Sequence, residues 1–194
     1  MRNSQAVSLA VVVFAANLAA GPITFIQTGT GSGSIGGTSF GSTRFTITSV
    51  GDTSNRTAIS GGYVIDPTSA AIAIVGVGTF TFSDSMHEFL SSGTVGFSRG
   101  SSSGDTDLFD GPTSSLLNTW DMASSIGPIN GSGTLFQWAS PAVNTSGGVL
   151  VFSDHTSDAT FQAILGTSTP EPGSWMLVLA GLAAVKMAAR QRKG

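Results

Sequence analysis

Short runs in which apolar side chains alternate with polar ones recur along most of this chain. Ile23 and Phe25, for example, are separated by Thr24. The same alternation recurs at residues 45–48, 79–82 and 160–162. A period of two with β-branched partners is typical of strands that bury one face. The pattern therefore predicts an all-β fold.

Pairs that contain glycine or proline separate these runs and predict turns. They are Gly36-Gly37, Gly51-Asp52, Gly61-Gly62, Asp66-Pro67, Gly111-Pro112, Gly127-Pro128, Asn130-Gly131 and Gly147-Gly148. Two continuous apolar runs, 70–77 and 149–152, fit central strands. Together these features predict an antiparallel β-sandwich or jelly-roll-like body over residues 21–166.

Two further stretches do not follow the strand pattern. Residues 29–41 could be a flexible linker, but we expect a hairpin, because Ile35 and Phe40 would gain from burial. Residues 114–118 have helix-like character, and we expect no more than a turn there.

The charge of the body restricts its partners. Residues 21–169 hold three arginines, no lysine and ten acidic residues, which gives 3 − 10 = −7. Nucleic-acid binding needs clustered basic side chains, so this class of partner is not expected. Adhesion to anionic lipid is disfavoured for the same reason. The chain has no cysteine, so the core must hold without disulfides.

The N-terminus has the layout of a secretory signal. Arg2 precedes an apolar run, residues 6–16, which only Ser8 interrupts, and small residues follow at 19–21. We expect a signal peptide over residues 1–20, forming a signal helix and cleaved after Ala19 or Ala20. The alternative is an uncleaved anchor helix, for which the run is short.

The C-terminus contains a second apolar stretch, residues 175–189, which only Lys186 interrupts. As a helix it would be about 22 Å long, against a hydrocarbon core of about 30 Å. Lys186 can extend its ammonium group to the headgroups. We expect a transmembrane helix with a basic, cytoplasmic tail over residues 175–194. The alternative is a buried helix of a soluble domain, which should show a polar face.

A linker, residues 167–174, carries Pro170, Glu171 and Pro172 just before this apolar stretch, and Arg190, Arg192 and Lys193 follow it. This order resembles the PEP-CTERM sorting signal of Gram-negative bacteria. The resemblance implies recognition by an exosortase, a membrane protein that cuts near the Pro-Glu-Pro motif and passes the protein outward. It assigns Pro170, Glu171 and Pro172 to the recognition motif. It assigns Arg190, Arg192 and Lys193 to the basic terminus. The β-rich body also resembles those of such proteins, which have no assigned activity.

One acidic cluster is a candidate calcium site. Asp105, Asp107 and Asp110 lie on a glycine-bounded segment and could supply oxygen ligands. We favour the alternative of a solvated acidic loop, because the spacing departs from the helix-loop-helix pattern. Calcium is the one cofactor that the sequence suggests.

Catalytic motifs are missing from the sequence. There is no Gly-x-Ser-x-Gly elbow, no His-Glu-x-x-His and no phosphate-binding loop. The two histidines, His87 and His155, each neighbour acidic residues, and we expect both on surface loops. The chain is therefore not expected to be an enzyme.

Trp120 and Trp138 have two interpretations. Exposed rings on a β-sandwich would stack on sugars, which would make them glycan-binding residues. A tryptophan in a small domain is more often part of the core.

These features predict an exported bacterial protein of the cell surface or extracellular matrix, such as a biofilm. Its partners would be an exosortase and, during transit through the inner membrane, the bilayer. The alternative function is a carbohydrate-binding module that acts on extracellular polysaccharide. A hydrolase using acidic residues ranks last, because no carboxylate pair is marked by its context.

Overall fold

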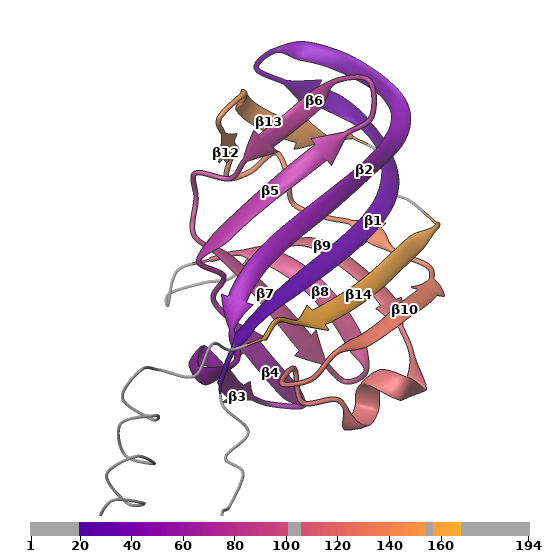
Figure 1. Ribbon diagram of the computed structural model, residues 1–194. Coiled ribbons are helices and arrows are strands. Elements are labelled where there is room, and N and C mark those ends of the chain that lie inside the picture. Colours follow the sequence, from indigo (N-terminus) through magenta and orange to yellow (C-terminus); the bar gives the residue numbers. More distant parts are fainter. Residues whose placement is uncertain (1–19, 101–105, 154–156, 168–194) are drawn as a thin grey trace, which may run out of the picture.

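The computed structural model describes residues 20–100, 106–153 and 157–167 (Figure 1). In these ranges the regular structure consists of β-strands and two short 3₁₀ turns, η1 (Thr53–Asn55) and η2 (Ser115–Thr119). Neighbouring strands pair antiparallel throughout. The prediction of an all-β, antiparallel fold is confirmed, as is the turn near residues 114–118. The finer assignment to a sandwich or jelly roll stays a prediction.

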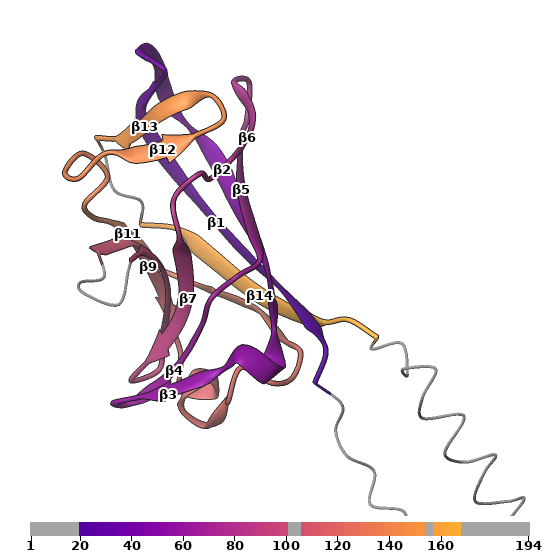
Figure 2. The same ribbon diagram turned by 90° about the vertical axis from the view of Figure 1, so that its left-hand side faces the viewer.

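The strands form two sheets. The larger sheet contains β1 (Pro22–Ile35), β2 (Thr38–Asp52), β5 (Ser69–Ile74), β6 (Gly78–Thr81), β10 (Ile126–Gly131), β12 (Val143–Thr145), β13 (Gly148–Phe152) and β14 (Ala159–Leu165). The smaller sheet contains β3 (Thr57–Ile59), β4 (Gly62–Ile65), β7 (Met86–Ser91), β8 (Thr94–Arg99), β9 (Thr106–Thr113) and β11 (Thr134–Leu135). Figure 2 shows the two sheets facing each other, with β1, β2 and β5 opposite β7 and β9.

The longest feature is the hairpin of β1 and β2, which reaches the top of Figure 1. Its turn is formed by Gly36 and Gly37, whose φ angles of 54° and 84° suit glycine. Ile35 is buried and Phe40 packs against the core. The predicted hairpin over residues 29–41 is thus confirmed, and burial of these two side chains explains it.

Strand β1 changes its neighbour half-way along. Its first half pairs with β14, from Ile23 opposite Leu165 to Thr28 opposite Thr160. Its second half pairs with β13, where Gly33 lies opposite Phe152. A β-carbon at position 33 would lie 2.0 Å from the Val151 carbonyl oxygen, so only glycine fits this approach. The sheet therefore forks between β14 and β13.

The end of the larger sheet beyond the fork closes on itself. Phe82, just after β6, forms a bridge with Thr145 of β12. The Ser83 amide donates to the Asn144 carbonyl and the Ser146 amide to the Thr81 carbonyl, both at 2.9 Å. The strands β1, β2, β5, β6, β12 and β13 consequently form a ring, which pairs strand edges that would otherwise be open.

The interior between the sheets is divided into two apolar clusters. The distal core, toward the hairpin tip, includes Phe45, Phe97 and Trp138. The basal core, toward the start of β1, includes Phe25, Trp120 and Phe161. Three buried polar residues from β1, β2 and β7 are also enclosed: Gln27, Ser49 and Glu88.

Four of the eight predicted turns and both predicted central strands are found, but the other four pairs behave differently. Gly51-Asp52, Gly111-Pro112, Gly127-Pro128 and Asn130-Gly131 lie inside or at the ends of strands, so the prediction of turns there is wrong. Pro128 is tolerated because β10 is an edge strand. Pro112 is tolerated because β11 pairs only with Phe109 and Asp110 of β9, so Pro112 has no partner on that side among the described strands. The runs 70–77 and 149–152 contribute to β5 and β13, which have neighbours on both sides.

The predicted segments at the two ends of the chain lie outside the described residues, apart from Ala20 and Thr167. Within residues 20–100, 106–153 and 157–167, no helix has the length and apolar character needed to cross a membrane.

A pair of substitutions on β14 tests the packing of the basal core. Phe161 is 1% exposed and its ring centroid lies 5.5 Å from that of Trp120, whereas Ile164 is 42% exposed. Phe161→Ala should lower the free energy of unfolding by about 3–5 kcal/mol because it leaves a cavity. Ile164→Ala should cost less than about 1 kcal/mol. Chemical denaturation of the full chain, followed by tryptophan fluorescence, measures both. Equal losses for the two variants would contradict this packing.

Candidate functional site

The two ends of the folded body lie side by side at one pole, which we call the basal pole. Strand β1 begins at Pro22 and β14 ends at Leu165, on neighbouring antiparallel strands (Figure 1). The Gly166 amide donates a hydrogen bond of 2.7 Å to the Pro22 carbonyl. The chain therefore enters and leaves the body at the same place.

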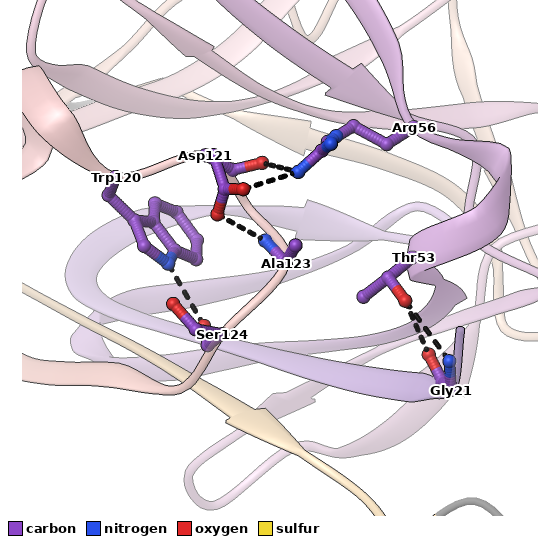
Figure 3. A network of polar contacts seen from close by, with 7 residues as sticks. All are labelled: Gly21, Thr53, Arg56, Trp120, Asp121, Ala123 and Ser124. Carbon is purple, nitrogen blue, oxygen red and sulfur yellow. Dashed lines mark hydrogen bonds and ion pairs between the residues drawn. The ribbon is translucent and has the colours of Figure 1, made fainter. Parts of the chain in front are cut away.

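The entry of the chain is fixed by η1. The Gly21 amide donates to Thr53 Oγ1 at 3.0 Å (Figure 3). The Thr53 amide donates to the Gly21 carbonyl at 3.1 Å. Asp52 caps this turn and accepts hydrogen bonds from the hydroxyl and amide of Ser54, which lower the pKa of Asp52 below its usual value. The polar caps leave the backbone of residue 21 well anchored.

A second contact at this pole joins η1 to the segment after η2. Arg56 donates from Nη1 to both the backbone oxygen and the Oδ2 of Asp121, each at 2.7 Å (Figure 3). The guanidinium also lies 4.9 Å from the centroid of the Tyr63 ring. Burial alone would raise the pKa of Asp121, but hydrogen bonds from the Ala123 amide and Arg56 outweigh it and lower this pKa.

The residues of the predicted sorting signal follow directly on this pole. Thr167 is the last described residue before them. Outside the described residues lie Pro170, Glu171, Pro172, Arg190, Arg192 and Lys193. Gly166, the last described residue that is hydrogen-bonded at the pole, therefore precedes Pro170 by four residues in the sequence.

Both tryptophans proposed for glycan stacking are core residues. Trp138 is fully buried and donates from Nε1 to the Leu108 carbonyl at 2.6 Å. Trp120 is 6% exposed and donates to the Ser124 carbonyl at 2.9 Å (Figure 3). Stacking on a sugar needs an open ring face, and neither residue offers one. The interpretation as core residues is therefore correct for both tryptophans, because each indole nitrogen donates to a backbone carbonyl inside the fold.

A buried carboxyl group, which sequence reasoning missed, joins the two sheets. Glu88 of β7 accepts from Gln27 Nε2 of β1 at 3.1 Å and from Ser49 Oγ of β2 at 2.5 Å. All three side chains are buried. Burial raises the pKa of Glu88 to about 8, against a lowering effect of the Ser49 hydrogen bond. At neutral pH this carboxyl is therefore mostly protonated.

The sequence did contain a signal for this cluster. In β1 the inward positions are Ile23, Phe25 and then Gln27, so the same alternation that predicts the strand also directs a glutamine into the core. Glu88 occupies the matching inward position between Met86 and Leu90 of β7. Alternation identifies which polar side chains point inward, but it cannot show that they meet.

The acidic segment is a strand and not a loop. Asp107 and Asp110 lie on β9, where Asp107 is opposite Ser98 and Asp110 is opposite Gly96. Burial first, and then the charge of Asp107, raise the pKa of Asp110 to about 6. Asp105 lies outside the described residues, and among those described no three metal-binding side chains come together. The loop prediction is wrong, and the calcium prediction stays a prediction.

The histidines differ from the expected pair of loop residues. His87 lies on β7 with its side chain 15% exposed, and its Nδ1 is 2.5 Å from Asp66 Oδ1. The prediction of a surface loop is thus wrong for His87, whose place in β7 follows from the Met86–Glu88–Leu90 alternation. His155 lies outside the described residues.

Comparison with known proteins gives one result. Residues 168–193 match the PEP-CTERM protein-sorting motif. The chain thus carries this motif behind a β-rich body. No curated protein and no solved structure matches the chain. The motif supports an exported protein sorted by an exosortase, a membrane enzyme, and implies transit through the membrane before display at the surface.

The buried carboxyl predicts a pH-dependent stability. Between pH 4.5, the ordinary pKa of a glutamate, and about 8, the folded state keeps the Glu88 proton while the unfolded state loses it. Each pH unit in this window should therefore lower the free energy of unfolding by about 1.4 kcal/mol, and the loss should end above the folded-state pKa. Glu88→Gln, a neutral side chain of the same shape, should remove this contribution.

The measurement is the difference between the wild-type and Glu88→Gln stability curves over pH 4 to 9, obtained by chemical denaturation. Taking the difference cancels the contributions of Asp110, Asp121 and the other titrating groups, which both proteins share. Parallel curves would show that Glu88 keeps an ordinary pKa in the folded state.

Proposed function

We propose that this chain is a surface or extracellular-matrix protein, cut by an exosortase near Pro170–Pro172. The body is not an enzyme and requires no cofactor, and the C-terminal segment holds it at the inner membrane only during sorting. The observation that carries the proposal is the match of residues 168–193 to the sorting motif. The sequence supports a non-catalytic body, since it lacks the common nucleophile, metal and phosphate-binding motifs.

The basal pole supports the order of events. Strand β14 ends at Leu165, and the matched motif begins at residue 168. A cut within or after the motif leaves all the described strands, both apolar cores and the hydrogen bonds of Gly166 and Gly21 at the pole in place. The body would consequently leave the membrane as a complete folded unit. Two facing sheets with shared apolar clusters are what a β-sandwich body of this kind requires.

Glycan binding remains the second candidate function. Trp120 and Trp138 cannot contribute to it, because their rings are buried. It is favoured by a polar cavity on the exposed face of the larger sheet.

Loss of the acidic residue of the motif should block sorting. Glu171→Ala removes the one charge between the two prolines, so the exosortase should no longer recognise the signal and most of the protein should keep its C-terminus through Gly194. Mass spectrometry of the membrane and extracellular fractions measures this. The matched control is Thr167→Ala, just outside the matched motif, which should be processed like the wild type.

Two results would contradict the proposal. One is wild-type protein recovered outside the cell with an intact C-terminus through Gly194. The other is Glu171→Ala processed as completely as Thr167→Ala.

A further inference from the structure

The fork in the larger sheet opens a cavity of about 560 Å³. Strand β14 pairs with β1 as far as Thr28, and β13 begins to pair with it at Gly33. Among the described strands, none is paired with residues 29–31 on this side. Side chains that line the cavity include Thr28, Thr30, Arg44, Asn130, Asp158 and Thr160. The cavity is thus a consequence of the topology and not of a surface irregularity.

The floor of the cavity is a row of polar side chains on neighbouring strands. Asn130 of β10 lies opposite Thr160 of β14, and Thr160 lies opposite Thr28 of β1. Directly opposed residues project to the same face of a sheet. Strands are about 4.8 Å apart, so the row is about 10 Å long. Thr28 and Thr160 also share a hydrogen bond through their hydroxyls.

Arg44 supplies a positive charge beside this row, opposite Thr30 in the register. The other two arginines of the body have structural contacts: Arg56 pairs with Asp121, and Arg99 donates to the carbonyls of Pro141 and Ala142. Within the described residues Arg44 is exposed and makes no ion pair. Its guanidinium can therefore bind an anionic group of a ligand in bidentate fashion.

We propose that this cavity binds a carboxylated polysaccharide, with Arg44 on a sugar carboxylate and the row of hydroxyl and amide groups on sugar hydroxyls. Asp158, at the rim, accepts hydrogen bonds from further sugar hydroxyls. None of the described residues that line the cavity is aromatic, so recognition by them is polar and depends on the direction of hydrogen bonds. Because the body carries a charge of −7, a polyanion is repelled elsewhere and binds through Arg44. The proposal rests on the proposed export, which brings the body to extracellular polysaccharide.

The test is affinity electrophoresis and calorimetry of the full chain in detergent micelles. The probes are an oligogalacturonate as the carboxylated glycan and a dextran oligomer as the neutral one. We expect binding of the first only, weakened by added salt. Arg44→Gln should weaken it at least about tenfold, the loss expected for a hydrogen-bonded charge. Thr28→Val should weaken it severalfold. Thr48→Val, on the same face but outside the cavity, is the matched control and should bind like the wild type.

Three results would overturn the proposal: no binding of the oligogalacturonate, equal binding of dextran, or equal effects of Thr28→Val and Thr48→Val. Competition by inorganic phosphate alone, with no saturable glycan binding, would reduce the site to a simple anion site. Since this assay uses purified protein, its failure is distinct from a failure of sorting, which the C-terminal mass of the Glu171→Ala variant reports.

Discussion

The pairing of the first strand with the last is the constraint on which the rest of the structure depends. Strand β1 lies between β14 and β2 near the basal pole and between β13 and β2 beyond the fork. One strand therefore holds both ends of the body together, carries inward residues of both cores and creates the cavity where its neighbours change. This pairing locks the last described strand in place without a disulfide, which the proposed release of the body from the membrane would require.

The buried contact of Glu88 with Gln27 and Ser49 works in a different way. It links the two sheets across the interior through hydrogen bonds, and its carboxyl is kept neutral by burial. Such a group stabilises less than an apolar side chain of the same size would, because burying it removes its hydration. Its hydrogen bonds are directional, so they favour the arrangement of the two sheets in which Glu88, Gln27 and Ser49 meet. We interpret it as a device that fixes how the sheets face each other.

Much of the fold could be predicted from the sequence, because alternation is a local property. The strands at Ile23, Phe45 and Phe161 and the Gly36-Gly37 hairpin follow from it directly. Gly111-Pro112 and Gly127-Pro128 were misread as turns, since only the sheet order shows that they lie where a proline needs no partner. The sorting motif could be recognised from the sequence because all its parts lie within one short segment, residues 168–193. The polar row with Arg44 was not, because it joins residues 28, 44, 130 and 160 through pairings that no local pattern specifies.

A cross-link at the basal pole tests this arrangement most directly. Thr24 and Ile164 lie opposite each other on β1 and β14, and directly opposed strand residues are close enough for a disulfide. The chain has no other cysteine, so a Thr24→Cys/Ile164→Cys variant reports this contact alone. In the exported protein it should form a disulfide and migrate faster on a non-reducing gel. Thr24→Cys/Thr160→Cys, four residues out of register, should not. Free thiols in the first variant, or equal cross-linking of both, would contradict the joined ends.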